Sequence, residues 1–434
     1  MCVNVCVKVP SKGEKLNPFW ITFGKYSKKS KELVLSRALG LCYGGAIGDS
    51  MGSYMKLGAK DLNESIVDKA MEMSGESCRY SQKMSSGQTT DASEMAMCVA
   101  RGLLHMTEAN FRRQEDSSQQ QQQVTMRYIV QEYKIWKQTN PVDRSAWVNR
   151  VKNSDDLDMI RKKALDNNEM LKKESKLGVT TNGSLIRVMP LIVYTLRLPA
   201  DTTFELIRLE SSLTHASHVV YYAITAYALT AQYLLRFPCQ DKRHEHAINF
   251  ALEFLNEQLK CADHTQMHNR AISEVKSWID DAVSIAKKNN NNNSSSSSSS
   301  PFLYSEKWIK DRINLTTAYV QDQPTHIKTG LQLAFYHLYL ANSFEQVMKE
   351  TLSFGGAANN NCCIVGGLLG ALHGIDHLAQ FRSKIDNWKP SPETSTSAKR
   401  EPYQAKHYAE YLPLLLKFAL HPRQHKIADT VPTL

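Results

Sequence analysis

The chain has 434 residues, which is enough for one large domain or two ordinary ones, and 42% of them are hydrophobic. Its formal net charge of +10 favours an acidic partner, such as an acidic protein surface, a phosphorylated ligand or nucleic acid; simple solubility is the alternative. No apolar run approaches the roughly 20 residues that span a bilayer. A nucleic-acid role rests on charge alone, because no aromatic-basic reading motif accompanies it.

Residues 1–31 are lysine-rich and are expected to form a basic N-terminal extension. They contain no continuous apolar stretch and no arginine, which argues against a secretory or mitochondrial signal. The nine cysteines of the chain include no CxxC pair, and Cys362 and Cys363 are adjacent. This spacing suits reduced thiols in an intracellular compartment, so we expect a cytoplasmic protein, with a cytoskeletal assembly as one candidate place.

Two polar homopolymer segments, 115–123 and 287–301, bury too little apolar surface to offset the entropy of ordering them. We interpret both as solvated loops inserted in one domain, because related motifs lie on both sides of each. The predicted organisation is a main domain over residues 32–380 with insertions at about 113–124 and 287–302. A C-terminal segment, 381–434, is expected to pack one helix on that domain.

Elsewhere the hydrophobic pattern is helical, and strand-like alternation is scarce. Residues 217–235 are apolar almost all round and predict a buried central helix. No sequence repeat is evident. The predicted fold class is therefore all-α, a single compact multi-helix domain. The expected helices are 33–57, 91–106, 126–138, 185–197, 217–235, 244–260, 266–286, 328–352 and 360–375.

Five polar or glycine-rich stretches each precede or begin a buried helix. In the first, GGAIGDSMG, the residues Gly48, Asp49 and Gly52 could form a tight turn that lines a pocket, although close helix packing explains the glycines equally well. In the second, GQTTDASEMAMCVARGLL, Asp91 or Ser93 is expected to cap a helix.

The third stretch, TNGSLIRVMP, has the polar turn Asn182, Gly183 and Ser184, which is a typical anion site at the start of a helix, with Arg187 one turn further on. The fourth, SSLTHASHVV, places His215 at the start of the central helix, where a cap or a satisfied core group is the alternative. The fifth, FGGAANNNCCIVGGLLGALHG, predicts a tight turn at Gly355 and Gly356 that could aim ligands into a cavity.

These stretches resemble motifs of the ADP-ribosylglycohydrolase family in their order, their spacing and their residues, over roughly residues 33–378. GAIGDSMG resembles the first Gly-Asp motif of the family. AMEMSG with GQTTDASEMAMCVARGLL resembles the second, TNGSLIRVMP and SLTHASH resemble its ligand loops, and TGLQLAFYHLYLANSFEQVMKETLSFGG leads into the last. Five motifs in order make the resemblance specific, although no single motif would.

This resemblance implies an all-α globule with two magnesium or manganese ions at the base of a cleft. It also implies hydrolysis of a bond at C1″ of ADP-ribose, with the metal pair orienting the ribose diol and a water. Such a site requires hard oxygen ligands, several of them carboxylates, because two dications must be compensated in a confined space.

The sequence departs from the family pattern at the residues that would hold the metals. In the second motif Ala92 stands where an aspartate is expected, and in the last motif Ala357 and Asn359 replace two more. Asn360 stands at the position of a ligand threonine. Lys56 stands at the position where some members carry a gating glutamate.

Thr90, Asp91, Asn359 and Asn360 are thus the residual metal positions, and Asp91 is the one carboxylate expected among them. A unit-charge pair at 4 Å contributes about 4 kcal/mol at an effective dielectric near 20, and a dication roughly doubles this. Losing three carboxylates removes on the order of 20 kcal/mol of gross attraction. We therefore expect no metal cofactor; a single cation held by these four residues is the alternative.

The expected nucleotide-facing positions are better kept. They are Asn182, Gly183, Ser184, Arg187, His215, Gly355 and Gly356. Elsewhere, His373 and His377 have the i, i+4 spacing of a zinc or copper pair on a helix, but no third ligand follows, and we interpret them as surface histidines.

Three functions remain open from the sequence. The first is a catalytically inactive homologue that serves as a structural or interaction subunit of a larger intracellular assembly. The second is a metal-independent module that binds ADP-ribose or an ADP-ribosylated protein. The third is an active ADP-ribosyl hydrolase with a rearranged magnesium or manganese site.

Overall fold

The computed structural model describes residues 28–55, 63–74, 84–112, 118–141, 156–175, 180–237, 240–262, 264–293, 324–389 and 400–420. Within these residues the chain is helical, and the extended pairing is a single antiparallel bridge between Thr181 and His326. The all-α prediction is confirmed. None of the helices in this part of the chain combines the length and apolar character needed to cross a bilayer.

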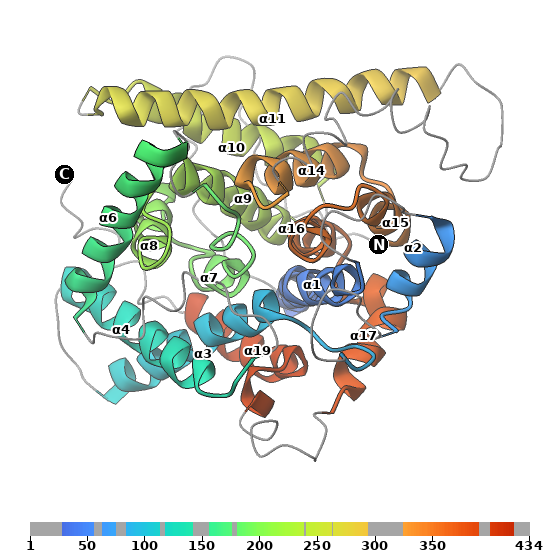
Figure 1. Cartoon of the computed structure of the whole chain (residues 1–434), viewed down its shortest axis with the longest axis horizontal. Helices are drawn as coiled ribbons and strands as arrows, with labels where there is room; N and C mark the ends of the chain where they lie inside the picture. Colours follow the sequence, from blue (N-terminus) through green and yellow to red (C-terminus); the bar gives the residue numbers. More distant parts are fainter. Residues whose placement is uncertain are drawn as a thin grey trace.

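The α-helices surround a central group in which α1, α9 and α16 lie side by side, with α10 and α11 along one edge and α3, α4 and α19 along the opposite one (Figure 1). Three short 3-10 helices follow α16 in the chain: η1 (Ile375–Leu378), η2 (Glu401–Tyr403) and η3 (Ala405–His407). The α-helices are α1 (Lys28–Ser53), α2 (Glu64–Met71), α3 (Asp91–Arg112), α4 (Ser118–Lys137), α6 (Leu157–Ser175), α7 (Met189–Tyr194), α8 (Ala200–Ser211), α9 (His218–Arg236), α10 (Arg243–Leu259), α11 (Gln266–Asn293), α14 (Ile327–Leu340), α15 (Phe344–Ser353), α16 (Ala358–His373), α17 (Ala379–Asn387) and α19 (Tyr408–Ala419).

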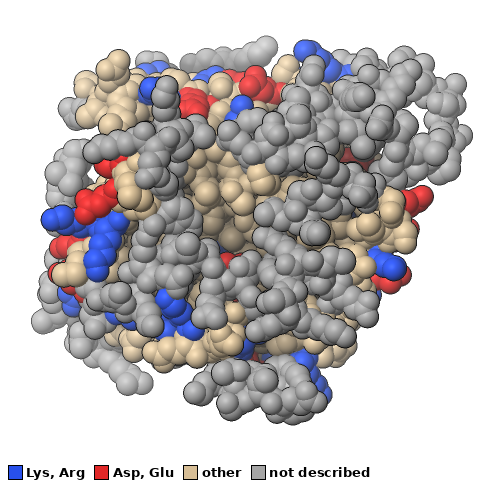
Figure 2. Space-filling view, in the orientation of Figure 1, with Lys and Arg blue, Asp and Glu red and all other residues tan. Residues whose placement is uncertain are grey.

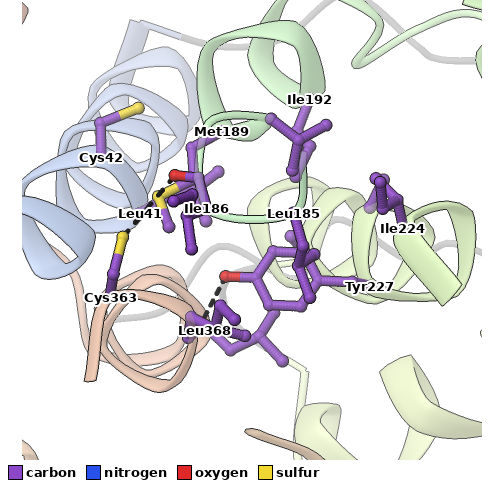
Figure 3. Packing of buried hydrophobic residues seen from close by; sticks show 14 of the residues in the cluster. Leu41, Cys42, Leu185, Ile186, Met189, Ile192, Ile224, Tyr227, Cys363 and Leu368 are labelled. Carbon is purple, nitrogen blue, oxygen red and sulfur yellow. Dashed lines mark hydrogen bonds between the residues drawn. The ribbon is translucent and has the colours of Figure 1, made fainter. Parts of the chain in front are cut away.

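The centre of the core lies between α1, α7, α9 and α16 (Figure 3). Helix α9 is buried, as its apolar sequence predicts. The Tyr227 hydroxyl on α9 donates to the Ile364 carbonyl at 2.9 Å. The Cys363 thiol donates to the Ile186 carbonyl at 3.6 Å. Burial raises the pKa of this thiol well above its usual value, so Cys363 behaves as an apolar core group rather than a nucleophile.

Helices α1 and α16 run antiparallel and touch backbone to backbone along a ladder of small residues. A Cβ added to any of four α1 glycines would lie 2.0–2.4 Å from the α16 backbone, closer than real Cβ atoms approach other atoms. Only glycine therefore fits at these four positions. The facing pairs are Gly40 with Gly370, Gly44 with Gly366, Gly48 with Cys362, and Gly52 with Ala358 and Asn359.

This ladder corrects one sequence prediction. The stretch that contains Gly48, Asp49 and Gly52 forms no tight turn but the last turns of α1. The alternative explanation, close helix packing, is confirmed. The packing places Asp49, next to Gly48 on the ladder, close to the start of α16.

The described parts of both homopolymer segments are helical, which corrects the prediction of loops. The glutamine run 119–123 lies in the first turns of α4, and α11 continues through the asparagines to Asn293. Adding a residue to an existing helix costs far less than starting one, and glutamine is a good helix former. The Asn289 amide also donates to the Tyr336 hydroxyl at 3.0 Å. Residues 294–301 lie outside the described part.

Two predicted helices are interrupted. The first turn of 185–197 is a series of turns, and only Met189–Tyr194 is helical. The span 328–352 divides into α14 and α15, because Ala341 adopts a left-handed conformation with φ 52° and Ser343 begins a new helix by accepting from the Gln346 N–H. Each break has a local sequence signal that the apolar periodicity outweighed: Pro190 in the first turn of α7, and the polar pair Asn342 and Ser343 before α15.

Four described α-helices have no counterpart among the expected elements: α2, α6, α8 and α17. In the C-terminal segment, α19 lies against α3 and α7. The Phe418 ring stacks on Tyr194 with centroids 5.3 Å apart, and the Arg197 side chain donates to the Leu420 carbonyl at 3.1 Å. These contacts attach α19 to the rest of the domain.

Candidate functional site

The site is built around Asp49, a fully buried carboxylate near the end of α1. Its Oδ2 accepts hydrogen bonds from the Thr90 N–H at 2.9 Å, the Ser93 hydroxyl at 2.7 Å and the Ser93 N–H at 3.3 Å. Its Oδ1 accepts from the Thr90 hydroxyl at 2.5 Å. Both carboxylate oxygens are therefore engaged by donors at the start of α3.

Asp49 thereby acts as the N-terminal cap of α3, although it belongs to another helix. The first N–H groups of a helix have no partner in the helix itself, and a negative charge there interacts favourably with the helix dipole. The expected cap was Asp91 or Ser93, but Asp91 is the first helical residue and Ser93 donates to Asp49. Burial raises the pKa of Asp49, and the bonds from Thr90 and Ser93 counteract part of this effect.

The last motif meets this cluster at the start of α16. Gly355 and Gly356 have φ values of 67° and 65°, so the expected tight turn is present and requires glycine. The Asn359 amide donates to Thr90 Oγ1 at 3.3 Å. The Asn360 amide donates to Asn182 Oδ1 at 2.8 Å. The structure thus brings the second, third and last motifs together.

The donor set at this junction does not fit a pair of dications. Ala92 and Ala357 are fully buried and offer methyl groups. Asn359 turns its amide N–H, which is no metal ligand, toward Thr90 Oγ1. No group of three or more His, Cys, Asp or Glu side chains in the described ranges is disposed to hold a metal. Lys56, at the gating position, lies outside these ranges.

Arg187 has its hydrogen bonds inside the protein. Its side chain is 1% exposed, and its Nε donates to Glu210 Oε1 at 2.7 Å. Its other nitrogens donate to the Thr214 hydroxyl at 2.8 Å and to the Gly183 carbonyl at 3.3 Å. The Tyr133 hydroxyl donates to the same Glu210 oxygen at 2.6 Å. The guanidinium therefore holds the third and fourth motifs against α8.

His215 is also satisfied within the fold. One ring nitrogen lies 2.7 Å from the Thr214 hydroxyl, and the other lies 2.8 Å from the Thr181 hydroxyl. A Cβ on Gly183 would come within 3.0–3.1 Å of this ring, so the glycine lets the loop lie directly on it. This geometry agrees with a satisfied core histidine that shapes the loop.

Two buried polar groups beside His215 have no hydrogen-bond partner in the structure: the side-chain nitrogen of Asn182 and the hydroxyl of Ser184. Both residues are 0% exposed. An unsatisfied buried donor costs about 1–3 kcal/mol, so an acceptor that reached these two groups would be bound favourably. They are the best structural signal for a ligand at this loop.

His373 and His377 have ring centroids 5.7 Å apart. His373 is half-buried and its Nε2 lies 3.0 Å from the Asn342 carbonyl, whereas His377 is exposed. Burial lowers the pKa of His373. Of the two, His377 is therefore a surface histidine. His373 is partly buried and forms a hydrogen bond with the segment between α14 and α15.

Sequence reasoning gave too little weight to Asp49 and did not single out Glu210 or Tyr133. The sequence does contain a signal for Asp49: it follows the third member of a glycine series spaced by four residues, which marks the helix face in contact with α16. Glu210 has no such signal, because its partners come from α4 and from the loop before α7.

The protein is an all-α globule. Its antiparallel helices α1 and α16 bring the first and last motifs to one buried polar junction, and this arrangement defines the class of the protein. The model of the ADP-ribosylglycohydrolase family matches residues 30–405. The chain belongs to the ADP-ribosylglycohydrolase family. A solved structure described as an "ADP-ribosylglycohydrolase-related protein complex" matches 90% of this chain and 100% of its own, with a TM-score of 0.52 and 16% identity. At this identity the likeness shows the fold alone. A search of curated protein sequences gives no match.

Proposed function

We propose that this protein is a catalytically inactive ADP-ribosylglycohydrolase homologue that serves as a structural or interaction subunit of an intracellular assembly. One observation carries the proposal: both oxygens of Asp49 are occupied by Thr90 and Ser93, at the junction where the family places its metals. The hydrogen bonds of the Asp49 carboxylate are thus supplied by the protein itself.

The replacements around Asp49 support the same conclusion. Hydrolysis of the family type needs a metal pair to orient a ribose diol and a water, and that pair needs several carboxylates. Here Ala92 and Ala357 are buried methyl groups, and Asn359 donates a hydrogen bond where an anion is expected. Each replacement removes negative charge while the apolar framework around it stays packed.

The partner that we propose is an acidic protein surface, and the place is the cytoplasm, with a cytoskeletal assembly as one candidate. The net charge of +10 supports an acidic partner. On the face drawn in Figure 2, the described charged side chains lie mainly toward the margin, and the visible described atoms at the centre are mostly uncharged.

The deciding experiment is the assay of ADP-ribose release by purified protein with magnesium or manganese, combined with manganese calorimetry. We expect no metal-dependent release and no manganese binding in the micromolar range. Metal-dependent release that Asp91→Asn abolishes would show an active hydrolase with a rearranged site and would overturn the proposal. The matched control is Asp68→Asn, an exposed aspartate on α2.

A second candidate function is a metal-independent ADP-ribose-binding module. The observation that favours it is the pair of unpartnered buried groups, Asn182 Nδ2 and Ser184 Oγ, in a loop that resembles a family ligand loop. We expect binding heat that EDTA does not change and that Asn182→Ala or Ser184→Ala reduces at least about tenfold, or about 1.4 kcal/mol. The absence of heat at high micromolar ADP-ribose would end this candidate.

A further inference from the structure

Three histidines gather at one corner of the fold; His218 lies in the fourth stretch, three residues after His215, and the other two lie around the start of α11. His218 is the first residue of α9, His264 precedes α11, and His268 lies in the first turn of α11. The ring centroids of His218 and His268 are 4.1 Å apart, and those of His264 and His268 are 5.0 Å apart. We call His218, His264 and His268 the histidine cluster.

The Tyr222 ring, one turn along α9, completes this corner with edge contacts to two of the histidines at 6.4 and 6.3 Å. The contact between the start of α9 and the start of α11 is thus made largely of aromatic rings, three of which can each take up a proton. Uncharged imidazole rings pack on one another without penalty, whereas protonated rings repel.

The groups that face the cluster from the neighbouring elements add positive charge. Arg208 on α8 acts on His268, and the N-terminal ends of α9 and α11 both disfavour a cation. Of the acids nearby, Glu205 pairs with Arg208 at 2.5–2.8 Å, whereas Asp201 accepts from the Gln258 amide at 3.0 Å and also acts on His264, where it favours a cation. The other titratable neighbours are Arg161, Tyr221, Tyr222 and Cys261.

We propose that the histidine cluster is a proton-sensitive contact that releases the N-terminal half of α11 from α9 when the pH falls. Among the described residues no three such side chains are disposed around a metal position, so protons are the cations that we consider here. The device is a contact between two helices, and it does not rest on the proposed function.

The direction of the pH effect on this contact follows from the environment of His268. Burial, His264 and Arg208 all lower the pKa of His268. A histidine whose pKa is lowered in the fold stabilises the fold fully above its ordinary pKa of about 6.5, and this contribution is lost as the pH falls below that value. A proton on one ring also opposes a proton on the next, so the contact weakens further with each one.

The C-terminal half of α11 is held by contacts that do not titrate in this range. The Gln332 amide on α14 donates to the Trp278 carbonyl at 3.3 Å, and Asn289 donates to Tyr336 at 3.0 Å. His326 faces Trp278 at 5.8 Å, but burial lowers its pKa to about 4, so this ring stays uncharged at pH 5.5. Release should therefore be confined to the first half of the helix.

The test is hydrogen exchange of the full chain at pH 7.5 and 5.5, expressed as protection factors. We expect residues 264–275 to lose protection at least about tenfold and residues 276–289 to change little. In His268→Gln the loss should fall to about twofold, and in the control His377→Gln, an exposed histidine, it should match the parent.

Equal changes in both halves of α11, or a loss in His268→Gln as large as in the parent, would overturn the proposal. A second measurement on the unchanged chain covers a failure of that variant to fold. The ring resonances of His268 should shift at a pH below its ordinary pKa, and titration of His268 at or above that ordinary value would contradict the proposal as firmly.

Discussion

Asp49 and Thr90 lie 41 positions apart in the chain and are joined by two hydrogen bonds, one from the Thr90 N–H at 2.9 Å and one from its hydroxyl at 2.5 Å. Thr90 in turn accepts from Asn359 at 3.3 Å. One threonine thus connects α1, α3 and α16. The charge of Asp49 is compensated by protein donors, which gives the junction a stable arrangement of its own.

The first prediction concerns that charge. Asp49→Asn removes the anion and turns one acceptor into a donor, so at least one N–H or hydroxyl of Thr90 or Ser93 loses its partner. We expect the free energy of unfolding to fall by about 2–3 kcal/mol, measured by urea unfolding at pH 7. Asp68→Asn on α2, an exposed site, should change it by less than about 0.5 kcal/mol. Equal effects of the two variants would contradict the capping role.

The second prediction concerns the ladder between α1 and α16. A Cβ at position 48 would lie 2.0 Å from the Cys362 carbonyl oxygen, and a helix backbone cannot move aside as a flexible side chain can. We expect Gly48→Ala to destabilise the fold by about 3 kcal/mol, although alanine is the better helix former. Lys31→Ala, at an exposed position of the same helix, is the control. A stabilised Gly48→Ala variant would show that the two helices are further apart.

The third prediction restores the missing acids. Ala92→Asp, Ala357→Asp and Asn359→Asp together place three buried carboxylates beside Asp49 and Asp91. Without metal the melting temperature should fall, because buried like charges repel and are poorly solvated. Manganese should then raise the melting temperature of the triple variant and leave that of the parent unchanged, as differential scanning calorimetry can show. If manganese raised the melting temperatures of the triple variant and the parent equally, the proposed loss of the metal site would be contradicted.

The fourth prediction concerns His337 on α14, which is 0% exposed. Burial lowers its pKa to about 3 and outweighs Glu350, whose carboxylate lies 3.7 Å away and favours the cation. The stability that the neutral ring provides is full above pH 6.5 and is lost as the pH falls toward 3. His337→Gln should therefore flatten the decline between pH 6.5 and 5, by up to about 1.4 kcal/mol per unit.

The measurement for His337 is the urea midpoint at pH 7, 6 and 5. His377→Gln, at an exposed histidine, should reproduce the pH dependence of the parent. A His337→Gln variant whose midpoint falls as steeply as that of the parent would mean that the ring is charged in the folded protein, with Glu350 as its counter-ion.

Much of the fold was predictable from local patterns. The central helix α9 and the Gly355–Gly356 turn both follow from residue type and spacing. The break between α14 and α15 was missed because helical periodicity was given more weight than the polar pair Asn342 and Ser343, which begins a new helix, and the left-handed conformation of Ala341 is visible only in the backbone. The glutamine run was misjudged for a different reason: composition measures how little a segment can bury, and it does not measure how readily a neighbouring helix extends through it.

Part of the candidate site was predictable from the motifs, whereas the contacts between its residues were not. The motifs placed Thr90, Asn182 and Asn359 among the candidates, and the structure brings their side chains to one junction. That Arg187 would pair with Glu210 in the core, and that Asp49 would cap α3, depends on contacts 23 and 41 or more residues apart. No local sequence pattern indicates a contact between residues so far apart in the chain, because such contacts form only when the helices pack.

The contact between α1 and α16 has a further consequence for how such a site changes over time. Because the two backbones touch without intervening side chains, the position of each motif is fixed by main-chain atoms and by the glycines that let them meet. Acidic residues at the ends of these helices can then be exchanged for alanine or asparagine while the scaffold keeps its shape. The shape of a catalytic pocket can in this way persist after its catalytic residues have been replaced, and the pocket becomes available for another purpose.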